Sequence, residues 1–307
     1  MHVAVRIPRL LQLALASLLP WACSSPESVP EVHRVPPPTE RATEEPVPPS
    51  REPLDVGVRA PELSAPFRVA SYNINFSTRN LDRVVQLIEE TDADIVALQE
   101  TTPAASKTLE RRTRTAFPHS HFAPAQWAGG HAIVSRVPLT NVERVEPVHG
   151  PFGALVAVAE LAGVPTQIVS VHLKPTLPSR GTSSVAVAVA FLENETIRVS
   201  EVEQILSRLD PEVPHLIVGD FNTLSSLSVV SRLKTAGYVD SQAHDPRHRN
   251  DPTWHWTWDG NPIELRIDYI FHSAEARTQS VRVIDRGPSD HYPVVATLAW
   301  AREVGRP

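Results

Sequence analysis

The chain has 307 residues, 41% of them hydrophobic, and a formal net charge of −6 at pH 7. This length allows one large domain or two ordinary ones with a substantial buried core. The net negative charge is unfavourable for tight, sequence-independent binding of long duplex DNA, because such binding requires many lysines and arginines. It is compatible with a nuclease that makes short contacts.

Residues 1–23 have the layout of an export signal. Two arginines precede an apolar run over residues 10–19, which is shorter than the roughly 20 apolar residues that span a membrane. The single cysteine, Cys23, excludes an internal disulfide, and it follows a small residue as in a bacterial lipoprotein signal. The proline and tryptophan at positions 20 and 21 depart from that signal. We expect an exported protein, either anchored to a membrane through lipid on Cys23 or periplasmic or secreted.

Residues 24–66 are rich in proline, with glutamate, arginine, serine and threonine between the prolines. Such a segment buries too little apolar surface to offset the entropy lost on ordering. We predict a disordered linker that holds the following domain away from its anchor.

Residues 67–301 have the pattern of one α/β domain, followed by a short tail over residues 302–307. Strands outnumber helices, and the connections are not regular βαβ units, so two packed sheets with helices outside are expected. In chain order, the predicted strands are 67–74, 94–100, 131–136, 154–161, 166–173, 214–219, 267–271 and 294–298, and the predicted helices are 81–90 and 199–209.

Polar residues recur where these strands end, which is where α/β folds carry catalytic groups. Each one also has a structural explanation, as a turn former, a cap or, for His172, a satisfied core histidine. The set comprises Asn73, Asn75, Glu100, His172, Asp220, Asn222, Asp268, Asp290 and His291.

The order of these residues resembles that in the endonuclease/exonuclease/phosphatase superfamily. Its members include DNase I-like nucleases, abasic-site endonucleases, bacterial sphingomyelinases and inositol-polyphosphate phosphatases. The most specific segments are GDFN at 219–222, RIDYIF at 266–271 and SDHYPV at 289–294. The resemblance spans residues 67–298 and implies a four-layer α/β sandwich, in which two mixed β-sheets are flanked by helices.

The chemistry of a phosphoester explains why these residue types are needed. The substrate is an anion attacked by water, so the protein must neutralise charge and orient the nucleophile. Mg²⁺, or Mn²⁺ in its place, prefers oxygen ligands. We expect Glu100 to be the main metal ligand and Asp290 a further carboxylate on the metal side. Asn73 and Asn75 would hold the metal or a phosphate oxygen.

Asp268 and His291 are interpreted as a carboxylate–histidine pair, in which the carboxylate fixes the imidazole tautomer. His291 would act as general base toward water or donate to a phosphoryl oxygen. Asp220 is the competing candidate for activating water, with Asn222 donating to the phosphate. His172 would contact the phosphate or assist the leaving group as an acid.

The candidate substrate-binding residues are less specific. Trp254 alternates with Trp256 and Trp258, which would place all three rings on one face, for stacking or for packing. Lys174 and Arg198 flank a long segment before the next helix and are expected either to shape substrate access or to be solvated. A further histidine, His131, stands where the family usually has asparagine, and it is assigned to the rim or to structure.

We therefore expect a metal-dependent phosphoester hydrolase, either a phosphodiesterase or nuclease or a phosphatase. The substrate would be nucleic acid, a phospholipid head group or a small organic phosphate, and the protein would be a monomer. The alternative is a catalytically silent surface binding or scaffold lipoprotein on the same fold, which is expected to have lost residues of the site.

Overall fold

The computed structural model describes residues 62–147, 150–176, 184–258 and 261–302. The expected export signal, with Cys23, and most of the expected linker lie outside these ranges. Within them, no helix is long and apolar enough to cross a membrane.

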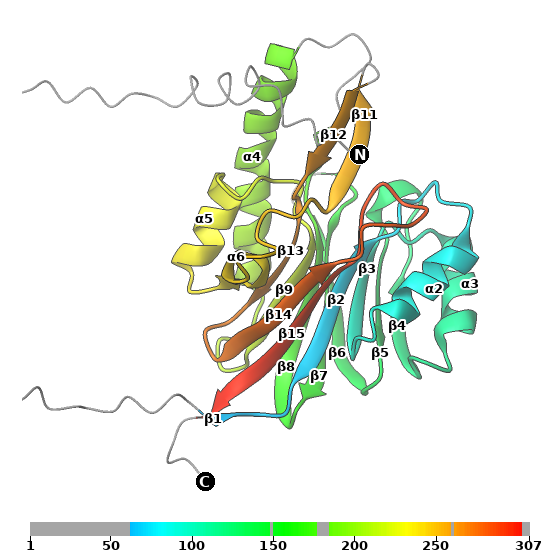
Figure 1. The fold of residues 1–307 in the computed structure, drawn as a ribbon, viewed down its shortest axis with the longest axis vertical. Helices are drawn as coiled ribbons and strands as arrows, with labels where there is room; N and C mark the ends of the chain where they lie inside the picture. Colours follow the sequence, from blue (N-terminus) through cyan, green and yellow to red (C-terminus); the bar gives the residue numbers. More distant parts are fainter. Residues whose placement is uncertain (1–61, 148–149, 177–183, 259–260, 303–307) are drawn as a thin grey trace, which may run out of the picture.

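Two β-sheets lie face to face, and helices cover their outer faces (Figure 1). The first sheet has the order β1–β15–β2–β3–β5–β4, with β14 also paired to β15. Within it β2 and β3 are parallel, whereas β15 runs antiparallel to β2. Its strands are β1 (Glu62–Leu63), β2 (Phe67–Asn73), β3 (Ile95–Gln99), β4 (His119–Ala123), β5 (His131–Ser135), β14 (Ala276–Val283) and β15 (Val294–Arg302).

The second sheet has the order β10–β13–β9–β8–β7–β6, in which β8 and β9 are parallel. A separate hairpin, β11 (Trp254–Trp258) and β12 (Asn261–Leu265), projects beyond it (Figure 1). The strands of the second sheet are β6 (Leu139–Val145), β7 (Gly153–Leu161), β8 (Val164–His172), β9 (His215–Asp220), β10 (Val239–Asp240) and β13 (Asp268–His272).

Three apolar cores separate four layers. The central core joins the inner faces of the two sheets and includes Ile133, Leu155 and Ile168. The outer face of the first sheet packs on α2 (Leu81–Glu90) and α3 (Pro103–Thr113). The outer face of the second sheet packs on α4 (Ser184–Leu206) and α5 (Ser228–Thr235). The short helices are η1 (Trp127–Gly129) and α6 (Ser241–His244). The predicted four-layer sandwich of two mixed sheets flanked by helices is confirmed.

The element boundaries correct several expectations. Strand β1 lies within the segment predicted to be linker, because Glu62 and Leu63 pair with Arg302 and Ala301. The last strand likewise extends one residue past the predicted domain end. Helix α4 begins at Ser184, well before the predicted residue 199. Its buried face carries charged side chains, so apolar spacing did not mark it. The predicted set also lacked α3, α5 and several strands, including the largely polar edge strands β4 and β6.

The topology gathers the polar strand ends at one edge of the sandwich. The carboxyl ends of β2 and β3 lie side by side in one sheet, and those of β8 and β9 in the other. Strand β13 is antiparallel to β9, so its first residue, Asp268, lies opposite the last residue of β9, Asp220. In the same way, antiparallel β15 brings the preceding loop, residues 284–293, to the end of β2.

Candidate active site

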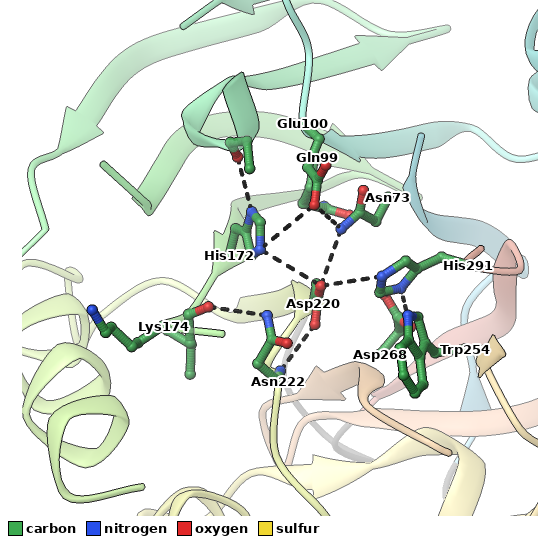
Figure 2. A network of polar contacts seen from close by, with 12 residues as sticks. Asn73, Gln99, Glu100, His172, Lys174, Asp220, Asn222, Trp254, Asp268 and His291 are labelled. Atoms are coloured by element: carbon green, nitrogen blue, oxygen red, sulfur yellow. Dashed lines mark hydrogen bonds and ion pairs between the residues drawn. The ribbon is translucent and has the colours of Figure 1, made fainter. Parts of the chain in front are cut away.

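Asp220 lies at the centre of the polar cluster, at the end of β9. Its side chain is buried, and Oδ2 accepts a 3.0 Å hydrogen bond from Asn73 Nδ2. The same oxygen lies 3.6 Å from Nε2 of His172 and 3.6 Å from Nε2 of His291. Figure 2 shows the two histidines on opposite sides of this carboxylate. Asp220 is therefore placed to contact a molecule that enters between the two imidazoles.

The residue before Asp220 must be glycine. Gly219 has φ +147°, and a Cβ there would lie 2.0 Å from the carbonyl oxygen of Val171 in the adjacent strand β8. Beyond the strand, the backbone N–H of Asn222 donates to Asp220 Oδ1 at 2.9 Å, and its side-chain amide donates to Leu173 O at 3.1 Å. The GDFN segment thus binds the ends of β8 and β9 together and fixes the Asp220 carboxylate.

Glu100 follows β3 in a left-handed backbone conformation, with φ +63°. Its Oε1 accepts a 3.0 Å hydrogen bond from Asn73 Nδ2, and its Oε2 accepts a 2.9 Å bond from the backbone N–H of Phe76. Because Asn73 Nδ2 donates to both Glu100 and Asp220, this one amide holds together two carboxylates that would otherwise repel each other.

Asp290 is held by neutral donors on both oxygens. Asn75 Nδ2 donates to Oδ1 at 2.7 Å, and Trp254 Nε1 donates to Oδ2 at 3.1 Å. Asn75 is itself fixed, since its backbone N–H donates to Asn73 Oδ1 at 3.0 Å. The two asparagines at the end of β2 therefore contact every carboxylate of the cluster except Asp268.

His291 and Asp268 form the predicted pair. Nδ1 of His291 lies 3.0 and 3.2 Å from the two carboxylate oxygens, and both side chains are buried. Thr253 Oγ1 accepts from the backbone N–H of Asp268 at 2.9 Å. Ser289 Oγ accepts from the backbone N–H of His291 and donates to Asn73 O. These contacts direct Nε2 of His291 toward Asp220.

The pair holds one proton at neutral pH. Burial opposes a charge on His291, but the carboxylates of Asp268 and Asp220 outweigh it and raise the pKa of His291 to about 10. Burial also raises the pKa of Asp268, and His291 opposes that shift. Since the hydrogen bond and the charge attraction favour the ion pair, the proton resides on the imidazole of His291.

His172 is brought into the site at the end of β8. Its Nδ1 is 3.1 Å from Ala128 O, which fixes the proton on that nitrogen, and its ring packs against Phe152. Nε2 then faces the cluster, 3.6 Å from Asp220 and 4.0 Å from Glu100. The ring is buried, and its Nε2 is directed at the two carboxylates.

The donor set fits a hard divalent cation. Asp220, Asp268 and His291 have ligand atoms within 4.8 Å of one another. An ion between Asp268 and His291 would have to break their hydrogen bonds, whereas Glu100 and Asp290 are held by neutral donors alone. Four carboxylates gather here with the two imidazoles, and carboxylate oxygens are ligands that Mg²⁺ or Mn²⁺ takes.

Two predicted substrate-binding residues lie outside this cluster. The Arg198 side chain is fully buried, and it donates to Lys174 O at 2.6 Å, to Thr176 Oγ1 at 2.6 Å and to Glu195 Oε2 at 3.1 Å. Its donors are therefore committed to holding the chain after β8. The backbone N–H of Lys174 donates to Glu201, while its side chain extends away from Asp220 (Figure 2). The geometry thus gives Arg198 a structural role and leaves Lys174 away from the reacting groups.

The third, Trp254, does lie at the site, next to His291 with ring centroids 6.5 Å apart. Trp254 and Trp256 share one face of β11 as expected, while the side chain of Trp258 lies outside the described part. The sequence analysis gave no role to Thr253 and Ser289, which orient Asp268 and His291. Ser289 is the first residue of the SDHYPV segment, and Thr253 directly precedes the candidate residue Trp254.

His131 is not part of the rim. It is fully buried between the sheets, with Nδ1 3.3 Å from Ser170 Oγ, and burial lowers its pKa to about 3. It is a neutral structural side chain behind the site.

Residues 70–291 match the Endonuclease/Exonuclease/phosphatase family. No curated protein matches the chain in sequence. Among solved structures, the endonuclease/exonuclease/phosphatase from Beutenbergia cavernae DSM 12333 shares the fold with a TM-score of 0.58 and 19% identity, over 77% of this chain and 72% of that one. The D. rerio TDP2 complexed with a single-strand DNA product has a TM-score of 0.60 and 18% identity, over 76% of this chain and 99% of that one.

The human Nocturnin catalytic domain with bound sulfate anion has a TM-score of 0.59 and 19% identity, over 76% of this chain and 94% of that one. At these identities the likeness concerns the fold alone. The family match rests on the sequence itself, and it covers most of the sandwich, from β2 to the SDHYPV segment. This chain belongs to the endonuclease/exonuclease/phosphatase family.

Proposed function

We propose that the protein is a divalent-metal-dependent phosphodiesterase that cleaves its substrate by attack of water at phosphorus. The observation that carries this proposal is the position of Asp220, whose Oδ2 lies 3.6 Å from both His172 and His291. A carboxylate held between two imidazoles can accept a proton from water while the imidazoles contact the phosphoryl group.

His291 is the residue assigned to the developing negative charge. Asp268 accepts from its Nδ1 and stabilises an imidazolium, so its Nε2, which faces Asp220, is placed to donate to a phosphoryl oxygen. Asp220 is then the remaining base. His172, whose Nε2 also faces Asp220, contacts the phosphate or the leaving-group oxygen.

Glu100 and Asp290, with the amide oxygens of the neighbouring asparagines, would hold the cation. When bound, a divalent cation supplies charge neutralisation at the phosphoryl oxygens. The surrounding residues position these groups. Asn73 Nδ2 donates to both Glu100 and Asp220, and so fixes the distance between the proposed metal ligand and the proposed base.

The comparisons support the substrate class without naming a substrate. The TDP2 relative was solved with a single-strand DNA product, and Nocturnin with sulfate, a tetrahedral anion shaped like phosphate. A silent scaffold on this fold is disfavoured, because Glu100, Asp220, Asp268 and His291 are all present and oriented. We further propose a single domain over residues 62–302, exported as a monomer behind a proline-rich linker.

The test is hydrolysis by the purified full chain, with bis-p-nitrophenyl phosphate, a single-stranded oligonucleotide and sphingomyelin as parallel substrates. We expect turnover with Mg²⁺ or Mn²⁺ and none with EDTA. Glu100→Gln should lower the metal-dependent rate by about 10²-fold or more, as expected when one electrostatic group of a preorganised site is removed. The matched control is Glu110→Gln, an exposed residue of α3. Undiminished turnover by Glu100→Gln would disprove the proposed metal site.

The membrane anchor is tested separately. We expect the full chain expressed in a bacterial host to partition into detergent, and Cys23→Ser to shift it to the aqueous phase. A wild-type chain found wholly in the aqueous phase would instead support an ordinary cleaved signal.

A further inference from the structure

We propose that two pairs of aromatic rings, Phe76 with Trp127 and Trp254 with Trp256, are ring-binding subsites on either side of the reacting phosphorus. The substrate class that fits them is an unpaired nucleotide chain, with one base on each side of the scissile bond. This inference rests on the proposed phosphodiesterase function and names its substrate class.

Within the described ranges, large exposed aromatic rings occur only around this site. Among the side chains that the structure describes, the large exposed aromatics are Phe76, Trp127 and Trp256, exposed by 41%, 73% and 50%. Each belongs to one of the two pairs. Large rings left in water are costly and mark binding surfaces when they gather at one place.

The first pair is attached to the side of the site that carries Glu100 and His172. The backbone N–H of Phe76 donates to Glu100 Oε2, and the ring of Trp127 meets that of Phe76 edge-on at 6.2 Å. The next residue, Ala128, accepts the hydrogen bond of His172. Trp127 itself has φ +62°, a strained conformation for a bulky side chain. The fold thus maintains strain in a turn that holds a tryptophan in solvent, which points to a function for that ring.

The second pair is attached to the side of the site that carries Asp290 and His291. Trp254 donates to Asp290 and lies beside His291, and Trp256 stacks on Trp254 with an interplanar angle of 3° and centroids 6.2 Å apart. On the other face of the same strand, His255 stacks on Tyr292 within the protein. One face of the hairpin is therefore used for packing, while the tryptophan face ends in the half-exposed ring of Trp256.

The two pairs lie across the reacting centre from each other. Trp127 belongs to the turn bonded to His172, Trp254 contacts His291, and the two histidines lie on opposite sides of Asp220 (Figure 2). A phosphodiester bound at Asp220 would extend toward an aromatic pair in both directions. Unpaired bases offer free π-faces to such rings, whereas bases in a duplex are already stacked. A choline head group would occupy rings on one side only.

The experiment compares two single-stranded oligonucleotides, one complete and one with abasic tetrahydrofuran residues on both sides of a single cleavable phosphate. For the wild-type full chain with Mg²⁺, we expect kcat/KM to be at least about tenfold higher on the complete strand, since stacking on one aromatic ring contributes that much or more. In Trp127→Ala and Trp256→Ala, this ratio should fall toward one through a higher KM. Trp127→Phe and Trp256→Phe should restore part of it.

The control variant is Leu63→Ala, which removes an exposed side chain of β1 at the opposite end of the sandwich and should keep the wild-type ratio. Equal kcat/KM on the two strands for wild type would overturn the inference, as would equal cleavage of duplex. So would tryptophan-dependent turnover that is seen only on sphingomyelin vesicles, which would assign the rings to a lipid surface.

Failure of the underlying function is recognised by a different measurement. If the wild type cleaves no phosphodiester, binding of the fluorescently labelled complete strand is followed by anisotropy in EDTA. Binding that is lost in Trp127→Ala and Trp256→Ala would keep the subsites and reject the hydrolase, while the absence of binding would reject both.

Discussion

Asp268 and His291 illustrate how one buried hydrogen bond can serve both chemistry and stability. Both carboxylate oxygens of Asp268 lie at hydrogen-bond distance from His291 Nδ1, so its proposed role is to hold the imidazole and favour its charged form. Without this carboxylate, His291 would lose both its tautomer and the main electrostatic reason for its raised pKa.

The first prediction concerns that role. Asp268→Asn should lower kcat by about 10²- to 10⁴-fold with little change in KM, because the substrate contacts remain while the imidazole loses its orientation. The surface pair of His248 and Asp251, 2.7 Å apart, offers a matched control. Asp251→Asn removes a contact of the same kind away from the site and should leave kcat within a factor of two.

The second prediction is a pH dependence of stability in EDTA. The pKa of His291 is raised to about 10, so its stabilising contribution is complete below its ordinary pKa of 6.5 and is lost as the pH rises through about 10. His291→Gln should therefore be less stable than wild type at pH 6, and the difference should shrink by pH 10. Urea unfolding at the two pH values measures this. A difference independent of pH would mean that His291 is not cationic in the fold.

Among the elements, helix α4 holds in place the segments that follow β8 and β9 of the second sheet. Glu195, Arg198 and Glu201 lie three residues apart and so share one face of the helix. Arg198 and Glu201 bind the backbone after β8, and Glu195 accepts hydrogen bonds from Thr223 Oγ1 and from the backbone N–H of Val229 at the start of α5. The helix thereby positions the loops that carry His172 and Asp220.

The third prediction follows from this face. Arg198→Met should lower the free energy of unfolding by about 3–5 kcal/mol, because it leaves Glu195 buried without its cation. Arg208→Met is the control, since that exposed arginine meets Glu143 at 3.7 Å in solvent and should change stability by less than about 1 kcal/mol. Urea unfolding of both variants measures this. A similar small loss in both would show that the buried ion pair does not stabilise the fold.

The sequence predicted the strands better than the helices, because the burial of the strands is visible in their composition and the buried charges of α4 are not. Runs such as residues 95–99 and 215–220 are apolar because both faces of these strands are buried, and they are easily recognised. The sequence VAVAVAFL at the start of α4 lacks the spacing of an amphipathic helix. Later in the helix, Glu195, Arg198 and Glu201 are buried because of their tertiary contacts. The site residues were predictable because strand-end motifs fix them. Their partners Thr253 and Ser289, and the burial of Arg198, depend on loop and helix geometry that spacing does not encode.

For the whole molecule, the central core is the part on which the site depends. Each sheet supplies some residues of the candidate site: Asn73 and Glu100 come from the end of strands in the first sheet, and His172 and Asp220 from strands of the second. Their mutual distances hold only while the two sheets stay packed on one another.

The fourth prediction tests this dependence. Ile168→Ala, in the central core and away from the site, should cost about 2–5 kcal/mol of stability. Activity and far-UV circular dichroism should be lost together at the same, lower urea concentration, as expected for a single cooperative unit. Loss of activity at a much lower urea concentration than loss of secondary structure would show that the sheets can separate before they unfold.

β15, the last strand that the structure describes, also determines when the candidate site is complete. It is synthesised after the other described strands, yet it pairs with β1, β2 and β14 inside the first sheet, and His291 lies just before it. A nascent or truncated chain that ends before residue 291 contains Glu100, His172 and Asp220 but lacks the imidazole opposite His172 and the strand that pairs with β2. The candidate site is therefore assembled only after β15 has been synthesised.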